Sequence, residues 1–296
     1  MLPSDRTYLE KQHLEFIRDI GHGTYGMVFL VYSQRFRRQF ALKRIAAKKF
    51  NFGEVQSLST IDSPYVTRLY DYCEIEGFIY LLMEFCPFSI HDILKTTGCI
   101  SPKETIRLAY GIIQALNLCH KNLISHGDLK PSNFLVDEFR RPKICDFGLA
   151  RLRNQNEICN NFDGSFAFMA PEVIQRVPYD PFKADIWSLG VSLYWMCTGN
   201  LPWQSGTIRF ITQEILNGSY NLGQVPTPDL IDLIRHCMQY NPDNRATAEE
   251  LLKLPCFSNL SSGKPIIFKR RSIDIIHPRV SMKVPIRKAF SNIERH

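Results

Sequence analysis

Short apolar runs interrupted by polar turns characterise the first 85 residues of the chain. The segments 14–20, 28–32, 39–45 and 78–83 are rich in apolar and β-forming residues and are bounded by glycine or polar positions, which predicts β-strands. Between them, at 55–61, Val, Leu and Ile recur at helical spacing, which predicts a helix. The first part of the chain is therefore predicted to be a small β-rich region with one helix.

The pattern becomes helical beyond residues 84–89. The segment 101–104, Ser-Pro-Lys-Glu, has the form of a capping box with proline at the first helical position. The segments 227–229 and 247–250 begin two further helices in the same way, and 183–198 is apolar enough to predict a mostly buried helix. We therefore expect an α+β chain of two lobes joined at 84–89, with a ligand cleft between them.

Composition excludes several classes of protein. The 296 residues, 45% of them hydrophobic, suit one large bilobal domain or two small ones. The longest apolar run, 78–83, is too short to span a membrane, and residues 1–12 lack the apolar stretch of a signal peptide. Nine cysteines without a Cys-x-x-Cys pair favour free thiols and argue against structural zinc. We expect a cytoplasmic protein, with the nucleus as the alternative location.

The net charge of +7 belongs to the C-terminal tail. Residues 264–296 contain nine Lys or Arg and two Asp or Glu, so the preceding chain is formally neutral. This charge therefore predicts no specific nucleic-acid partner for the body of the protein. The tail is either a solvated extension, a segment that binds acidic surfaces such as membranes or nucleic acid, or an inhibitor of the protein's own cleft. We expect a monomer.

A glycine-rich segment, 21–26, lies between two predicted strands. Glycines allow backbone amides to approach phosphates closely. Similar spacing marks dinucleotide-binding folds, but there a helix follows the glycines, whereas here a strand follows. A simple hairpin turn is the alternative.

Lys43 lies in the predicted strand 39–45. A lysine in an apolar strand is usually solvated or protects a sheet edge, but it can also bind nucleotide phosphates when a carboxylate holds it. Glu54 opens the predicted helix and can face Lys43. Taken alone, such a pair is more often a surface ion pair of little energetic worth.

Two polar segments carry the strongest chemical signal. The segment 126–133, His-Gly-Asp-Leu-Lys-Pro-Ser-Asn, follows the capped helix, and Asp-Phe-Gly at 146–148 follows a short predicted strand. Phosphoryl transfer needs an oriented acceptor and neutralised phosphate charge. Asp128 can accept a hydroxyl proton, Lys130 can stabilise the transferring group, and Asn133 with Asp146 can bind Mg²⁺. Asp-Phe-Gly alone would be interpreted as a turn.

Taken in order, these segments resemble the protein kinase family. Further matches are Ala-Pro-Glu at 170–172, the buried-helix pattern 185–190, and Arg245, which in the family pairs with the glutamate of Ala-Pro-Glu. The resemblance covers 16–257 and implies a bilobal kinase fold that uses ATP with Mg²⁺ or Mn²⁺. It divides the chain into an N-terminal extension (1–13), a kinase domain (14–258) and a basic tail (259–296). Within the domain it implies an N-lobe (14–84), a hinge (84–89) and a C-lobe (90–258).

The resemblance also implies roles for individual residues. The catalytic set would be Lys43, Glu54, Asp128 and Lys130, and the metal ligands would be Asn133 and Asp146. The nucleotide would be bound by Ile20, Gly21, His22, Gly23, Thr24, Tyr25, Gly26, Met27, Val28, Ala41, Lys43, Met83, Glu84, Cys86 and Leu135. Leu58, Leu69, His126 and Phe147 would stack as an internal spine.

The substrate class follows from the loop after Asp128. Lysine at 130 resembles the serine/threonine branch of the family, which implies protein substrates with Ser or Thr acceptors. The segment 185–203 resembles the calmodulin-dependent group. Ser132 gives no support for a preference for arginine-rich substrates. A pseudokinase that acts as a binding scaffold is the alternative; loss of Lys43, Asp128 or Asp146 would favour it, and all three are present.

The chain departs from the family at the residue before the catalytic aspartate. Gly127 replaces the usual arginine, which in the family receives an activation-loop phosphate. Between 149 and 169 the only hydroxyl side chain is that of Ser165, which we expect to hydrogen-bond near Asp128. We therefore predict activity without activation-loop phosphorylation. The short segment between Lys43 and Glu54 leaves open the position of the helix that Glu54 begins.

Overall fold

The computed structural model describes residues 1–23, 26–152, 164–203 and 207–261. The chain divides into two units, Met1–Leu260 and Ser261–His296, and the account below concerns the first. The described residues do not include most of the predicted tail (262–296 of 259–296). They also leave out Thr24 and Tyr25 and the stretch 153–163. None of the helices in the described ranges is long and apolar enough to cross a membrane.

The N-terminal part is built on a five-stranded antiparallel sheet in the order β1-β2-β3-β5-β4. Its strands are β1 (Leu14–Gly23), β2 (Gly26–Ser33), β3 (Arg38–Ala46), β4 (Leu69–Ile75) and β5 (Phe78–Glu84). The four predicted strands correspond to β1, β2, β3 and β5. Sequence reasoning missed β4, because polar residues interrupt its apolar pattern and leave it no clear alternation.

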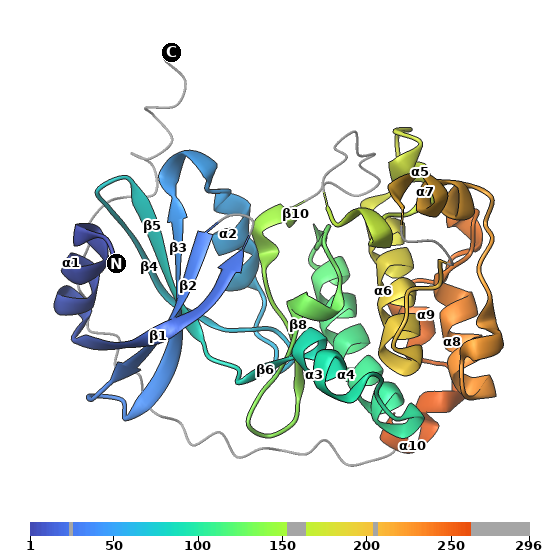
Figure 1. The fold of residues 1–296 in the computed structure, drawn as a ribbon, viewed down its shortest axis with the longest axis horizontal. Helices are drawn as coiled ribbons and strands as arrows, with labels where there is room; N and C mark the ends of the chain where they lie inside the picture. The colour runs from blue at the N-terminus through green and yellow to red at the C-terminus, as the bar shows by residue number, and fades with distance from the viewer. Residues whose placement is uncertain (24–25, 153–163, 204–206, 262–296) are drawn as a thin grey trace. The chain divides into compact units, whose positions relative to one another are not determined.

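Two helices pack on opposite faces of this sheet. The predicted helix is α2 (Phe52–Thr60), which lies on the face that joins the main core. The other face is covered by α1 (Pro3–Gln12), which was predicted only as a polar extension; Figure 1 shows it beside the sheet. Tyr8 of α1 is fully buried and stacks on Tyr80 of β5 with a centroid distance of 4.8 Å. The extension is therefore part of the folded N-terminal region.

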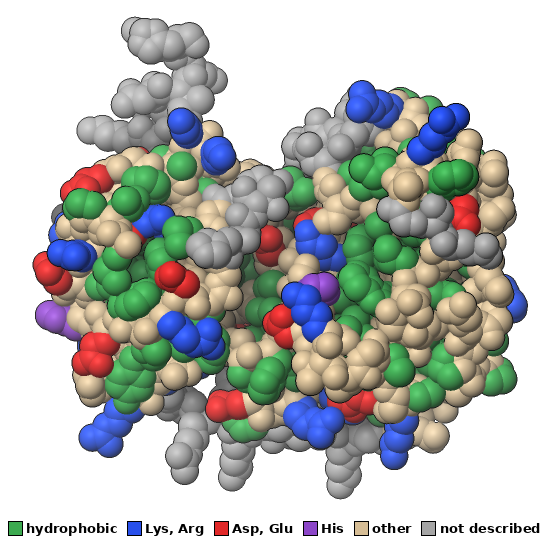
Figure 2. All heavy atoms as spheres, viewed as in Figure 1, with side chains coloured by type: hydrophobic (Ala, Val, Ile, Leu, Met, Phe, Trp, Pro, Cys, Tyr) green, Lys and Arg blue, Asp and Glu red, His purple; other side chains and the backbone are tan. Residues whose placement is uncertain are grey.

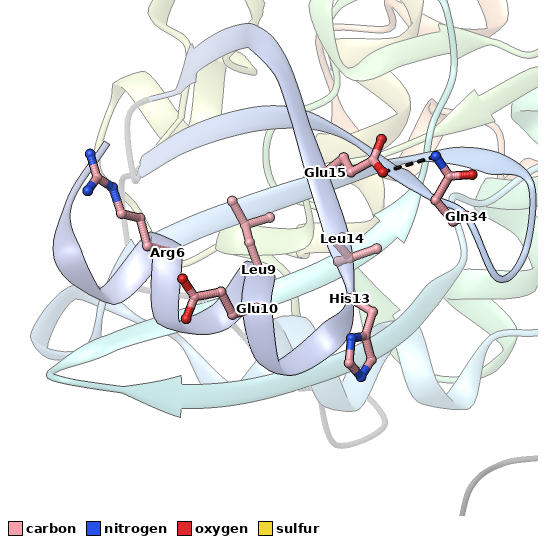
Figure 3. A pocket seen from close by; sticks show the side chains of 7 residues that line it. All are labelled: Arg6, Leu9, Glu10, His13, Leu14, Glu15 and Gln34. Carbon is pink, nitrogen blue, oxygen red and sulfur yellow. Dashed lines mark hydrogen bonds between the residues drawn. The ribbon is translucent and has the colours of Figure 1, made fainter.

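A surface pocket of about 570 Å³ lies at the junction of α1 and β1. Figure 3 shows its lining side chains and the hydrogen bond from Gln34 Nε2 to Glu15 Oε1, 3.0 Å. Its lining contains none of the site residues predicted from the sequence.

The C-terminal part is mostly helical. Its helices are α3 (Ile90–Thr97), α4 (Pro102–Lys121), α5 (Pro171–Ile174), α6 (Pro181–Thr198), α7 (Ile208–Leu216), α8 (Pro228–Cys237), α9 (Ala248–Leu251) and α10 (Ser258–Ser261). Its short strands are β6 (Phe88–Ser89), β7 (Ile124–Ser125), β8 (Phe134–Val136), β9 (Pro142–Ile144) and β10 (Arg151–Leu152). Helix α6 is buried along most of its length, as predicted.

Short 3-10 turns connect these elements. They are η1 (Ala47–Lys49), η2 (Pro131–Asn133), η3 (Phe147–Leu149), η4 (Phe166–Phe168), η5 (Leu222–Gln224), η6 (Pro242–Asn244) and η7 (Pro255–Phe257). Two of them, η2 and η3, immediately follow Lys130 and Asp146, so the predicted site residues lie on tight turns.

The observed starts of α4, α8 and α9 can be compared with the helix caps predicted from the sequence. Thr247 and Glu250 form the predicted capping box, and Thr227 accepts a hydrogen bond from the third helical amide of α8. At α4 the predicted start is right but the predicted box is wrong. Ser101 makes no side-chain cap, and the Glu104 carboxylate instead accepts two hydrogen bonds from Arg107, at 2.7 and 2.8 Å. A local arginine thus competes successfully for the carboxylate that the box requires.

Candidate active site

Lys43 lies at the centre of a buried charge network. Its Nζ is 2.7 Å from Glu54 Oε1 and 2.8 Å from Asp146 Oδ1. Alternation along β3 directs Lys43 to the face covered by α2, and Glu54 lies in the first turn of that helix. The short connection that left the position of α2 open therefore still brings Glu54 to Lys43.

Each charge in this network changes the pKa of the others. Burial by itself would lower the pKa of Lys43, but the carboxylates of Glu54 and Asp146 raise it above its usual value. Burial raises the pKa of Glu54, and Lys43 opposes the effect only in part. For Asp146, burial acts upward, but Lys43 outweighs it and holds the pKa below its usual range. Lys43 is therefore cationic and Asp146 ionised at neutral pH.

Asp146 adopts a backbone conformation that is uncommon for a residue with a side chain, with φ 61° and ψ 71°. Such strain is maintained by the surrounding structure and clusters at functional sites. After it, Phe147 is fully buried and its ring lies 4.9 Å from that of His126. Leu58 and Leu69 join the same hydrophobic cluster, so the four predicted spine residues belong to one core.

The buried Asp185 of α6 holds the loop that carries Asp128. Its two carboxylate oxygens accept hydrogen bonds from the backbone amides of His126 and Gly127, both at 2.8 Å. His120 Nε2 lies 3.0 Å from the same carboxylate. The sequence singled out Asp185 as part of a motif, but only the structure gives it this positioning contact.

Asp128, Lys130 and Ser165 form a compact polar cluster. Lys130 Nζ is 2.7 Å from Asp128 Oδ2 and donates to Ser165 Oγ at 2.7 Å. The backbone amide of Ser165 donates to Asp128 Oδ1 at 3.0 Å. Lys130 therefore joins the hydroxyl of Ser165 to the carboxylate of Asp128, and the backbone of Ser165 contacts the same carboxylate.

Asn133 is joined to the same cluster. Its Nδ2 donates to the backbone oxygen of Asp128 at 2.8 Å and to Asp128 Oδ2 at 3.2 Å. The positive charge of Lys130 also contributes to the lowered pKa of Asp146, which links the two halves of the site electrostatically. Figure 2 shows the surface hollowed between the sheet region and the helical region, with acidic and basic side chains along the hollow.

Comparison with known proteins identifies the family of this chain. The family model described as the protein kinase domain matches residues 14–257. The chain belongs to the protein kinase family. Its curated relatives include sperm motility kinase 3A of Mus musculus, 33% identical over 257 residues, which cover 85% of this chain and 51% of that protein.

Other relatives come from distant organisms. The probable serine/threonine-protein kinase MARK-A of Dictyostelium discoideum is 32% identical over 271 residues, which cover 87% of this chain and 25% of that protein. The carbon catabolite-derepressing protein kinase of Saccharomyces cerevisiae is 31% identical over 247 residues, 81% of this chain and 39% of that protein. The chain thus spans about half or less of the length of these relatives. The predicted bilobal α+β kinase fold is confirmed.

Within this kinase domain, four of the apolar residues predicted to bind the nucleotide come from four different strands. Ile20, Val28, Ala41 and Leu135 are contributed by β1, β2, β3 and β8, and all four are partly exposed. Met83, which was also predicted to bind the nucleotide, is buried opposite Ala41 in the β3–β5 pairing. Their role in nucleotide binding stays a prediction.

The glycine-rich segment joins β1 to β2, as expected from its place between two predicted strands. Gly21, His22 and Gly23 end β1, whereas Gly26 and Met27 begin β2, and the two strands pair in antiparallel register. A strand therefore follows the glycines, as the kinase resemblance requires and the dinucleotide fold does not.

The hinge contains an ion pair that the sequence did not reveal. Glu84 Oε2 is 3.0 Å from Nζ of Lys143, a buried residue of β9 that also donates to the backbone oxygen of Pro64 at 2.8 Å. Nearby, burial raises the pKa of Cys86 to about 12, so its thiol is neutral at physiological pH. Glu84 was predicted only as a nucleotide-binding residue of the hinge. Its ion pair was missed because nothing in the local sequence around Lys143 marks that lysine as a hinge contact.

Proposed function

We propose that this kinase domain transfers the γ-phosphate of ATP to serine or threonine hydroxyls of proteins, with Asp128 as the base. The observation that carries the proposal is the cluster of Asp128, Lys130 and Ser165. In it the carboxylate of Asp128 contacts the ammonium group of Lys130, which also donates to the hydroxyl of Ser165. The curated relatives described as serine/threonine kinases support the same substrate class.

In this proposal each protein group has one task. Asp128 orients the acceptor hydroxyl and takes its proton. Lys130 stabilises charge on the transferring group, and Lys43, held by Glu54, provides a fixed positive charge for the phosphates. Because Asp185 holds the backbone of the loop, the carboxylate of Asp128 is positioned before substrate binds.

The donor atoms suit ATP with a divalent cation. The amide nitrogen of Asn133 donates its hydrogen bonds to Asp128, and Asp146 Oδ1 accepts a hydrogen bond from Lys43. Among the described residues, no group donates a hydrogen bond to Asn133 Oδ1 or to Asp146 Oδ2. Uncommitted carboxylate and amide oxygens are ligands that Mg²⁺ accepts. When bound, the metal would neutralise phosphate charge.

The decisive experiment combines the protein with ATP, Mg²⁺ and a degenerate peptide library. We expect phosphate on serine or threonine, and a fall in kcat of about 10²–10⁴-fold in Asp128→Asn. Asp146→Asn should lose turnover and also weaken the binding of ATP with Mg²⁺. A purified, folded wild-type protein that binds nucleotide but transfers no phosphate would instead support the scaffold alternative.

We further propose that activity does not need phosphorylation of the activation segment. Gly127 has φ 80°, and a Cβ there would lie 3.3 Å from the backbone oxygen of Leu149. A Cβ on Gly164, whose φ is 127°, would lie 3.0 Å from the backbone oxygen of Gly127. The two glycines therefore allow direct backbone approach between the catalytic loop and the segment before Ser165, in place of an arginine and a phosphate.

Phosphatase treatment tests this second proposal. Protein produced in bacteria and stripped by phosphatase should phosphorylate a good peptide as fast as untreated protein. Ser165→Ala should lower kcat because Lys130 loses its hydroxyl partner, and Ser165→Asp should not restore it. Loss of activity on treatment, with the responsible phosphate located between residues 146 and 172, would refute the proposal.

A further inference from the structure

Asn51 precedes α2 and makes two kinds of contact. Its Oδ1 accepts a hydrogen bond from the amide of Gly53 at 2.9 Å, which caps the helix. Its Nδ2 reaches a segment almost a hundred residues away, and donates to the backbone oxygens of Gly148 and Ala150 at 3.2 and 3.4 Å. One side chain therefore joins the start of α2 to the backbone that follows Asp146.

Together with the charge network, these contacts close a ring. Three residues after Asn51, Glu54 pairs with Lys43, which in turn pairs with Asp146. Two residues after Asp146, Gly148 accepts from Asn51. The ring contains the two ion pairs of Lys43, whose charge substrate phosphates would share, and a neutral link through Asn51 made only by protein atoms.

The orientation of the Asn51 amide follows from its neighbours. If the amide were reversed, its oxygen would face the backbone oxygens of Gly148 and Ala150, and its nitrogen would face the amide of Gly53. The approach is also close, because a Cβ on Gly53 would lie 3.0 Å from the backbone oxygen of Ala150. The helix start and the segment after Asp146 are thus fitted to each other.

We propose that Asn51 is a positioning residue for the phosphoryl-transfer site, acting through Glu54 and Asp146. The inference rests on the proposed kinase function. A neutral side-chain amide here fixes α2 against the start of the activation segment. The arrangement complements the glycine contact at the end of that segment, between Gly127 and Gly164, and neither contact requires a phosphate.

Asn51→Asp separates the two contacts of the side chain. Aspartate keeps an acceptor for the Gly53 amide and is as good a helix cap as asparagine. Its second oxygen, however, would face two backbone oxygens and cannot donate to them at neutral pH. We expect kcat to fall about tenfold, with KM for the peptide unchanged because Asn51 does not face the acceptor. Asn51→Ser, which retains a cap without the repulsion, should give a smaller fall.

A matched control exists elsewhere in the chain. Asn221 caps η5 through the same asparagine-x-glycine arrangement, since its Oδ1 accepts from the amide of Gly223 at 2.7 Å. Asn221→Asp should leave kcat and KM unchanged. It therefore controls for the general effect of introducing an aspartate at such a cap.

Hydrogen exchange supplies a readout that does not depend on turnover. In Asn51→Asp, amides in 52–60 and 147–152 should exchange faster than in the wild type, whereas Asn221→Asp should leave both segments unchanged. Wild-type kcat together with wild-type exchange in Asn51→Asp would overturn the inference. If the wild-type protein proved inactive, the proposed function would fail, and the exchange measurement would still decide whether Asn51 holds the two segments together.

Discussion

Lys43 and Arg44 are consecutive residues of β3, and their side chains leave the strand on opposite faces of the sheet. Each is a mostly buried cation held by a carboxylate from the helix that covers its face. Lys43 pairs with Glu54 of α2 at 2.7 Å, and Arg44 pairs with Asp5 of α1 at 2.5 Å. By residue type, burial and distance the two sites are nearly equivalent.

The sites of Lys43 and Arg44 differ in the groups that make the remaining contacts with each cation and its carboxylate. Around Arg44, protein groups supply the other contacts. Its guanidinium lies over the rings of Phe29 and Phe78, at 5.4 and 5.3 Å from their centroids, and Tyr80 donates its hydroxyl hydrogen to Asp5 at 2.8 Å. Around Lys43, the second carboxylate is that of Asp146, whose side chain is 30% exposed.

A buried ion pair is therefore insufficient to identify a functional cation. Both cations have lost most of their contact with water, and both have a carboxylate that compensates. What distinguishes Lys43 is a second, partly exposed partner with an oxygen left for a ligand. We expect changes at Arg44 to alter stability and changes at Lys43 to alter catalysis.

The largest effect should come from Arg44→Met. Removing the guanidinium leaves the carboxylate of Asp5, 1% exposed, buried without its cation, and breaking such a pair costs about 3–5 kcal/mol of the free energy of unfolding. Chemical denaturation would measure this loss. The double variant Asp5→Leu with Arg44→Met should recover most of it, since an apolar pair can replace a buried ion pair. Below the melting temperature, kcat should stay near the wild-type value.

Lys43→Met is the same substitution one residue earlier, and its effect should be on catalysis. Loss of a preorganised charge at the reacting group costs about 10²–10³ in kcat. Stability should change less than in Arg44→Met, because burial already raises the pKa of Glu54 and the carboxyl group can become neutral. Peptide phosphorylation and thermal melting would measure both quantities. Equal losses of stability in the two variants would contradict the comparison.

Tyr80→Phe should weaken the Arg44 site without breaking it. The hydroxyl of Tyr80 donates to Asp5 at 2.8 Å, and a hydrogen bond to a charged group contributes about 1.5–3 kcal/mol. The ring and its stacking on Tyr8 remain. Denaturation should show a loss smaller than that of Arg44→Met, with kcat unchanged. A loss as large as that of Arg44→Met would show that the hydroxyl, rather than the ion pair, holds α1.

The smallest effect should come from an ion pair that is more exposed. Glu104, 27% exposed, pairs with Arg107, and Glu104→Gln should cost about 0.2–1 kcal/mol. The hydrogen bond from Arg107 is the main reason that the pKa of Glu104 lies below its usual value of 4.5.

A carboxylate with a lowered pKa stabilises the fold above its unfolded pKa, and this contribution is lost as pH falls through the folded pKa. The difference in melting temperature between the wild type and Glu104→Gln should therefore be constant from neutral pH down to about 5. It should shrink below 4.5. A difference that grew on acidification would contradict this assignment.

The residues of the candidate site could be chosen from the sequence because phosphoryl transfer can use only a few residue types. Asp128, Lys130, Asn133 and Asp146 lie in short segments whose residue types and spacing are recognisable without coordinates, and the structure groups Asp128, Lys130 and Asn133. Lys43 and Glu54 could be paired because one lies on a predicted strand and the other begins the next predicted helix.

The contacts that were missed are not marked by residue type. Helix α1 has too few apolar residues for a helical pattern, and its stability depends on Tyr80 and Arg44, far along the chain. The pair of Glu84 with Lys143 likewise joins distant segments. Asn51 could be read as a helix cap, but its second contact, with the backbone after Asp146, involves carbonyl groups that every residue has.

The sequence by itself determined the family, most of the strands and helices that carry the candidate site, and the charged residues that the structure brings together there. Local patterns suffice for these features, because strand alternation, helix starts and reactive side chains are all properties of neighbouring residues. Tertiary structure alone decided that Arg44 pairs with Asp5, that the first helix covers the face of the sheet opposite α2, and that the amide of Asn51 meets the backbone after Asp146. Each depends on the packing of distant segments, where burial and the available partners set the energy of a charge or hydrogen bond.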